Sequence, residues 1–226
     1  HSHIAAVYLQ LKNTKEALNW GKKAVKISPT SADTHYNLGL VYQEMYQQSG
    51  NKKDLGKAED ELKRATVLNP KLEPVHLELA RLYAKRGDHE LSIIRYRLAL
   101  NISNDPKVWE ELGNLYLKMG ESFKAENAFM KAMELKPKSE ESHLQMGASY
   151  IQQKRFDEAI AEFQKALLIN PKNEKAYFSI GTIFMDQRKF KEAAESFEKA
   201  LAINPTYVDS AYNLGLVYLQ LEKTEL

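Results

Sequence analysis

The 226-residue sequence contains no cysteine, which excludes disulfide bonds, zinc sites built from thiolates and a cysteine nucleophile. It has no apolar run of the roughly 20 residues that a membrane-spanning helix needs. It also lacks the order of basic, apolar and small residues that is typical of a signal peptide at the N-terminus. We therefore expect a soluble chain, compatible with the cytoplasm, and leave open a targeting signal outside these residues.

An excess of charge of one sign is also missing. The 32 lysines and arginines nearly balance the 30 aspartates and glutamates, which leaves a net charge of +2. Proteins that hold nucleic acids through phosphate contacts depend on a positive surface. We therefore expect no nucleic-acid partner, and the 43% of hydrophobic residues favours an ordinary globular fold.

An internal repeat is the main feature of the sequence. Five of the seven prolines follow an aliphatic and a polar residue, and the last three of these are 34 residues apart. The same period aligns a small residue with an aromatic residue three positions later. The prolines are Pro29, Pro70, Pro137, Pro171 and Pro205; the small residues are Ala5, Gly39, Ala80, Gly113, Gly147, Gly181 and Gly215; the aromatic residues are Tyr8, Tyr42, Tyr83, Tyr116, Tyr150, Phe184 and Tyr218.

Each repeat contains two segments with helical periodicity. Trp109, Gly113 and Tyr116 lie on one helical face, and Ala125 and Phe129 share a face further along the chain. Small residues let two helices approach closely, while the aromatic side chains fill the volume beside them. Because proline cannot donate the helical hydrogen bond, it ends the second helix. Each repeat is therefore predicted to be a pair of helices.

The pattern resembles the tetratricopeptide repeat, and the resemblance covers essentially the whole chain. It implies an all-α fold, a right-handed α-solenoid of antiparallel helix pairs with about six units and a final helix, thirteen helices in all. We expect a single domain over residues 1–226. The predicted units are 1–31, 32–72, 73–105, 106–139, 140–173 and 174–207, followed by a terminal helix at 208–226.

The second predicted unit is seven residues longer than the period. The surplus lies between Tyr42 and Ala58, where Gly50 and Asn51 indicate a turn. We expect an inserted loop there, within a longer hairpin.

The resemblance also implies where a partner binds, because the first helices of such repeats line a concave groove. We call the corresponding residues the groove positions. The candidate binding residues among them, together with the neighbouring Lys118, are Tyr36, Asn37, Arg81, Asn114, Lys118, Leu144, Ala148, Ile151, Phe178, Thr182, Met185, Tyr212 and Asn213.

The groove positions differ in chemistry along the chain. Those around Arg81 and Lys118 are charged with mixed sign, and those from Leu144 onward are mostly apolar. An apolar stripe at positions that the repeat's packing does not require favours an interaction surface; the alternative is that some of these side chains, Ile151 in particular, pack between neighbouring units. Asparagine side chains such as Asn114 and Asn213 can bond the backbone of an extended peptide.

Some relatives bind chaperone C-terminal carboxylates through a set of lysine, arginine and asparagine residues in three consecutive units. The matching positions in the second to fourth units read Tyr36 with Leu40, then Glu78, then Lys107 with Glu111, so we do not expect a carboxylate clamp of that kind.

We predict no catalytic residue, no metal site and no cofactor. The sequence has no HExxH, Gly-x-Ser-x-Gly or dinucleotide-binding motif. His35, His76 and His143 occupy the same repeat position, so they are separated by whole repeats and lie too far apart to share one ion. We expect these histidines to contribute to packing and not to metal binding or catalysis.

The resulting hypothesis is a non-enzymatic scaffold that binds a peptide segment or partner protein in its groove, in complex assembly or as a chaperone or adaptor. Two alternatives are kept: an RNA-binding helical-repeat module, and the recognition arm of a larger enzyme. Self-association into a homo-oligomer is also left open.

Overall fold

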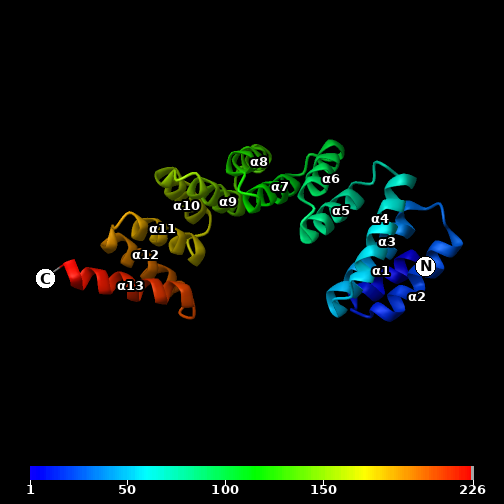
Figure 1. Cartoon of the computed structure of the whole chain (residues 1–226), viewed down its shortest axis with the longest axis horizontal. Coiled ribbons are helices and arrows are strands. Elements are labelled where there is room, and N and C mark those ends of the chain that lie inside the picture. The colour runs from blue at the N-terminus through cyan, green and yellow to red at the C-terminus, as the bar shows by residue number, and fades with distance from the viewer. Residues whose placement is uncertain (225–226) are drawn as a thin grey trace. The chain divides into compact units, whose positions relative to one another are not determined.

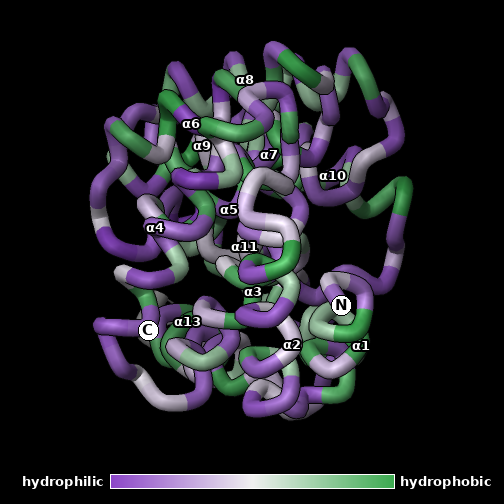
Figure 2. Tube along the Cα trace, turned by 90° about the vertical axis from the view of Figure 1, so that its right-hand side faces the viewer, coloured by the Kyte–Doolittle hydropathy of each residue, from purple (hydrophilic) through white to green (hydrophobic). Residues whose placement is uncertain are grey.

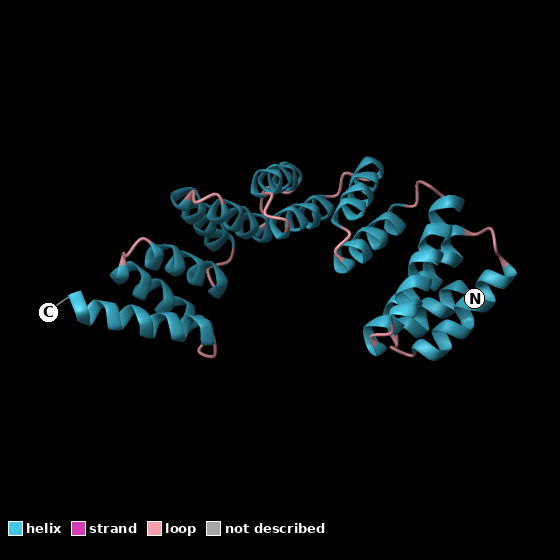
Figure 3. Ribbon diagram, in the orientation of Figure 1, coloured by secondary structure: helices cyan, strands magenta, loops and turns pink. Residues whose placement is uncertain are grey.

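The computed structural model describes residues 1–224, and every regular element within them is an α-helix (Figure 3). Thirteen helices follow one another along the chain in antiparallel pairs (Figure 1), which confirms the predicted number and type of elements. Their bounds are α1 (Ser2–Gln10), α2 (Thr14–Ile27), α3 (Ala32–Ser49), α4 (Lys52–Leu68), α5 (Glu73–Arg86), α6 (His89–Ile102), α7 (Pro106–Lys118), α8 (Ser122–Leu135), α9 (Glu140–Gln152), α10 (Phe156–Ile169), α11 (Glu174–Asp186), α12 (Phe190–Ile203) and α13 (Val208–Thr224).

The helices form two compact units, His1–Asn104 with α1 to α6 and Asp105–Leu226 with α7 to α13. Within the first unit each helix pair packs on the next through α2 with α3 and through α4 with α5. In the second unit α8 packs on α9, α10 on α11, and α12 on α13. Each unit therefore buries its apolar helix faces by stacking neighbouring pairs. That residues 1–226 form one domain stays a prediction.

The surplus of the second repeat lies in its helices. α3 and α4 are 18 and 17 residues long, against 13 or 14 residues for the helices of the four repeats that follow. Only Gly50 and Asn51 separate them. Gly50 has a φ of 68°, a left-handed conformation that ends α3, and the Asn51 side chain accepts a hydrogen bond from the Lys53 N–H at the start of α4. The inserted residues thus lengthen the helical hairpin around a two-residue turn.

In the second unit, the paired helices touch where a glycine meets a phenylalanine ring. Polar and apolar residues are interspersed along the helices (Figure 2). The buried face of α8 carries Ala125, Phe129 and Ala132. A Cβ atom added at Gly113 would lie 2.5 Å from Cε1 of Phe129, and one at Gly147 would lie 2.7 Å from Cε1 of Phe163. No carbon pair packs so closely, so only glycine allows this approach of backbone to ring.

This contact predicts opposite effects of the same substitution at two aligned glycines. We expect Gly147→Ala to destabilise the protein by about 1–2 kcal/mol, because the Phe163 ring has to move out of its packed position. Nothing lies within 4 Å of a Cβ atom at Gly215. There the gain in helix propensity predicts that Gly215→Ala is neutral or stabilises by up to about 1 kcal/mol. Urea unfolding monitored by circular dichroism measures both changes, and equal midpoints for the two variants would contradict the proposed register.

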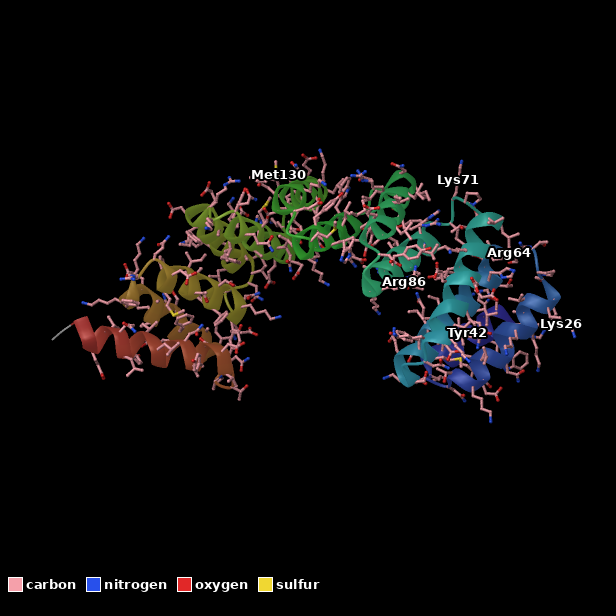
Figure 4. The ribbon with its side chains drawn as sticks, viewed as in Figure 1. Lys26, Tyr42, Arg64, Lys71, Arg86 and Met130 are labelled. Atoms are coloured by element: carbon pink, nitrogen blue, oxygen red, sulfur yellow. The ribbon has the colours of Figure 1, made fainter. Side chains whose placement is uncertain are left out.

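Hydrogen bonds within a polar cluster connect α4 to α5 in the first unit. Both oxygens of Glu59 accept hydrogen bonds: Oε1 from Lys63 Nζ at 2.7 Å and from the Tyr83 hydroxyl at 3.1 Å, and Oε2 from Arg86 Nη1 at 2.6 Å. Arg86, labelled in Figure 4, is the last residue of α5. Burial by itself raises the pKa of Glu59, but the hydrogen bonds from Lys63 and Arg86 outweigh it and lower the pKa below 4.5.

A lowered pKa means that the folded state prefers the ionised carboxylate more than the unfolded state does. The stabilisation from Glu59 is therefore complete above its ordinary pKa of 4.5 and is lost as the pH falls below that value. We expect Glu59→Gln to cost about 1–2 kcal/mol at neutral pH. Denaturant titrations of both proteins at several pH values should show this difference shrinking as the pH falls below 4.5. A pH-independent difference would contradict the ionic role of Glu59.

Candidate partner-binding surface

The groove positions of the first unit lie on α3 and α5. Arg81 Nη1 donates a 2.7 Å hydrogen bond to Glu78 Oε1, and both residues line a small hollow of about 120 Å³. Tyr36 is half-buried beside them, and its pKa is raised by burial and further by the charge of Glu78. Asn37 Nδ2 donates to Ser2 Oγ at 2.5 Å. The Asn37 amide is thus used inside the fold, which reduces what it offers to a peptide.

In the second unit a polar hollow of about 570 Å³ lies at the start of α9 and α11. Its charged residues have mixed sign and come from helix N-termini and from the loop that precedes α9; its lining is Glu110, Lys136, Lys138, Ser139, Glu140, Glu141, Leu144, Ile169, Asn173, Glu174 and Lys175. Glu110 Oε1 accepts hydrogen bonds from the hydroxyls of Ser139 at 2.7 Å and Ser142 at 2.5 Å. Of the thirteen candidate residues, only Leu144 lines this hollow.

Four of the apolar candidates contribute to packing between helix pairs. Leu144 and Ile151 pack against the cluster of buried residues around Phe163, and Phe178 and Met185 pack against the cluster around Phe197. The Phe178 ring centroid lies 5.7 Å from that of Phe197 and 5.1 Å from that of Tyr207. These side chains are long enough to reach the neighbouring helices, so only part of each remains on the surface. The binding role predicted for them stays a prediction.

The last helix presents the most accessible apolar groove positions. Tyr212 is 67% exposed and Leu216 is 38% exposed on α13. A hollow of about 600 Å³ lies between α11 and α13, and Met185 on α11 and Leu216 on α13 both line it. Its remaining lining residues are Asp186, Arg188, Phe190, Val217 and Gln220. The structure therefore brings two apolar groove positions together with charged and amide groups around one opening.

The candidate residues predicted from the sequence do not include Asp186, Arg188 and Gln220, which line this hollow. Gln220 lies one helical turn after Leu216, so helical spacing alone was enough to find it. Asp186 ends α11 and Arg188 follows in the turn with a φ of 58°. The helical period does not encode a turn conformation of that kind. It therefore could not predict that these two charged residues border the hollow.

The polar candidates fall into two groups. Thr182 Oγ1 donates to the Phe178 carbonyl at 3.0 Å and so is satisfied within its own helix. The half-buried amides of Asn114 and Asn213 make no hydrogen bond to other groups in residues 1–224. Lys118 is exposed at the end of α7, and Ala148 is half-buried on α9. Asn114 and Asn213 therefore keep the donor and acceptor groups that an extended peptide requires.

The aligned histidines link helices to neighbouring segments. Nε2 of His35 lies 3.0 Å from the Pro29 carbonyl, and Nε2 of His76 lies 2.8 Å from the Pro70 carbonyl. Both histidines are buried at the start of their helices. His143 Nδ1 lies 2.6 Å from Glu162 Oε2 on the paired helix. These contacts agree with the predicted packing role.

Residues 1–224 offer neither a cluster of metal-ligating side chains nor a membrane-spanning helix. Histidine and acidic side chains form no group of three or more that could hold a metal ion. No helix in this part of the chain combines the length and the apolar character needed to cross a membrane.

Three family models match the sequence. A model described as TPR repeat matches residues 5–45, and one described as Tetratricopeptide repeat matches residues 106–139. The third, described as Tetratricopeptide repeat protein 21 C-terminal ARM domain, matches residues 130–225. No curated protein sequence is similar enough to count as a relative.

Solved structures with the same fold are numerous. PilF of Pseudomonas aeruginosa aligns with a TM-score of 0.73 and 19% identity, covering 95% of each chain. YrrB, described as a TPR protein with an unusual peptide-binding site, aligns with a TM-score of 0.67 and 18% identity over 85% of this chain and 96% of its own. The first TPR of Spaghetti (RPAP3), bound to the HSP90 peptide SRMEEVD, aligns with a TM-score of 0.50 and 25% identity over 53% of this chain and 95% of its own.

Proposed function

This chain is a tetratricopeptide repeat protein, and from that premise we propose that it is a non-catalytic scaffold that holds a segment of a partner protein against α11 and α13. The observation that carries the proposal is the hollow of about 600 Å³ in which Met185 and Leu216 meet. Apolar anchors beside a few charged and amide groups are what a peptide-binding site needs, because the apolar contacts supply free energy and the polar groups fix orientation.

The exposure of the α13 side chains supports this choice of site. Tyr212 and Leu216 are separated by one helical turn and lie on the same side of the helix. Large, partly exposed tyrosine and leucine side chains are suited to cover an incoming apolar side chain. The amide of Asn213 stands next to Tyr212 and is available to a peptide backbone. We infer that the bound segment is extended or a short helix with apolar anchors.

The compared proteins supply independent support for a peptide as ligand. The description of YrrB names a peptide-binding site, and the RPAP3 repeat domain is bound to a peptide. The present groove positions lack the basic set expected of a carboxylate clamp, and apolar residues dominate α13 instead. The ligand proposed here is therefore bound through internal apolar side chains and not through its C-terminal carboxylate.

A double variant on α13 tests the site. A phage-displayed peptide library selected on the wild-type chain supplies a labelled peptide, and fluorescence anisotropy measures its affinity. We expect Tyr212→Glu with Leu216→Glu to weaken binding by about 100-fold or more, because two apolar anchors are replaced by charges that must be desolvated.

The matched control is Val208→Glu, which changes a 75% exposed residue of the same helix outside the groove positions. This control should retain wild-type affinity, and circular dichroism checks that all variants fold. Unchanged affinity of the double variant would refute the location on α13. A wild-type chain that enriches no peptide would argue against the proposed function itself.

A further inference from the structure

One side of α13 is uncovered among the described residues. Ala211, Gly215 and Tyr218 follow one another at spacings of four and three residues, so they lie on the same side of the helix. Nothing lies within 4 Å of a Cβ atom at Gly215, and Tyr218 is 44% exposed. α13 packs on α12 through a different side, on which Ser210 and Val217 are buried (Figure 1). We call the side with Ala211, Gly215 and Tyr218 the open side of α13.

The equivalent side is covered by a second helix in the three preceding pairs of the second unit. Gly113 of α7, Gly147 of α9 and Gly181 of α11 align with Gly215, and all three are buried. A Cβ atom added at these glycines would lie 2.5, 2.7 and 2.7 Å from the nearest ring carbon of a phenylalanine on the second helix. The chain therefore contains three examples of a helix that fits the open side of α13.

These three second helices share one pattern of buried residues. Each has a phenylalanine with an alanine four residues before it and another three residues after it, and all six alanines are completely buried. Small side chains on both sides of the ring let the helix approach the glycine closely. The three sets are Ala125, Phe129 and Ala132 in α8, Ala159, Phe163 and Ala166 in α10, and Ala193, Phe197 and Ala200 in α12.

A basic residue precedes this pattern in α10 and α12. Arg155 and Lys189 each stand four residues before the first alanine of their pattern. Cζ of Arg155 lies 4.2 Å from the ring centroid of Tyr150, and Nζ of Lys189 lies 5.8 Å from that of Phe184. Both rings align with Tyr218, so a basic residue at this spacing can make the same cation–π contact on α13.

α13 also differs from the other first helices at the residue where they turn. In α1, α5, α7, α9 and α11, the residue seven positions after the aligned small residue has a positive φ and lies in the turn to the second helix. These residues are Lys12, Gly87, Gly120, Lys154 and Arg188, with φ values of 57°, 89°, 74°, 58° and 58°. The corresponding residue of α13 is Glu222, which is helical, and the helix continues to Thr224. The described chain therefore does not turn back onto the open side as the other repeats do, which favours a covering helix from another molecule.

We propose that the open side of α13 binds an amphipathic helix of a partner protein, which carries alanine, phenylalanine and alanine at spacings of four and three residues and a basic residue four positions before the first alanine. A second copy of this chain is a poor source of that helix, because α8, α10 and α12 already bury these residues in their own pairs. The open side differs from the side of α13 that carries Tyr212 and Leu216. The site is therefore additional to the proposed groove site, and either assignment can fail without the other.

A labelled peptide with the sequence of residues 189–204 tests the proposal, because it contains the whole pattern. A lactam bridge between the exposed Glu195 and Lys199 keeps this short peptide helical. Fluorescence anisotropy during titration with the full chain, up to about 500 µM, should show saturable binding with a dissociation constant of about 100 µM or below. The same peptide with Phe197→Ala should bind at least about 10-fold more weakly, because it lacks the ring that packs on the glycine.

A substitution in the full chain locates the binding site. Gly215→Leu places a side chain where the phenylalanine ring of the peptide has to lie, so it should weaken binding by at least about 10-fold. The space around Gly215 is open, so this variant should fold, which circular dichroism checks. The control Leu168→Lys alters an 84% exposed leucine of α10 and should bind the peptide as the wild type does.

Three results would overturn the proposal. The first is a wild-type chain that does not bind the peptide at about 500 µM. The second is equal affinity of the wild type and Gly215→Leu, which would place the peptide elsewhere on the chain. The third is a wild-type dimer in sedimentation equilibrium that Gly215→Leu dissociates, which would assign the open side to a second copy.

Discussion

The structure depends on the close approach of two helix backbones at a small residue. In the repeats of the second unit, a glycine on the first helix faces the ring of a phenylalanine on the second, with no room for a Cβ atom between them. This contact brings the helices of a pair close together and fixes their rotation about their axes. Once the rotation is fixed, each remaining side chain of the first helix either packs against a neighbouring helix pair or lies on the surface.

That division explains the character of the candidate site. The first helices use Leu144, Phe178 and Met185 partly to pack against neighbouring pairs. The same residue types on α13 are more accessible, as Tyr212 and Leu216 show. The proposed partner segment would gain most where packing within the chain leaves apolar area uncovered. In that proposed complex the charged groups around the hollow would contribute orientation more than free energy.

The outward faces follow the opposite rule, because nothing in the repeat requires them to be apolar. Charged residues there keep the helix faces hydrated and separate. On α6 the outward side carries Leu91, Ile94 and Leu98, while the buried side keeps Ser92, Tyr96 and Ala99.

The sequence alone determined the helices, their pairing and the residues that join them, because the repeat places small and aromatic residues at fixed helical spacings. It also singled out the histidines that pack against the preceding loops, whereas the binding role of the groove positions on α13 stays a prediction. Only the tertiary structure decided that Asn37 is bonded to Ser2 and that Phe178 lies against Phe197 and Tyr207. It likewise decided that Asp186 and Arg188 border the hollow beside Met185. The physical reason is that a period of 34 residues specifies on which face of its helix a side chain lies. Side-chain length, rotamer and turn conformation decide which other residues that side chain contacts.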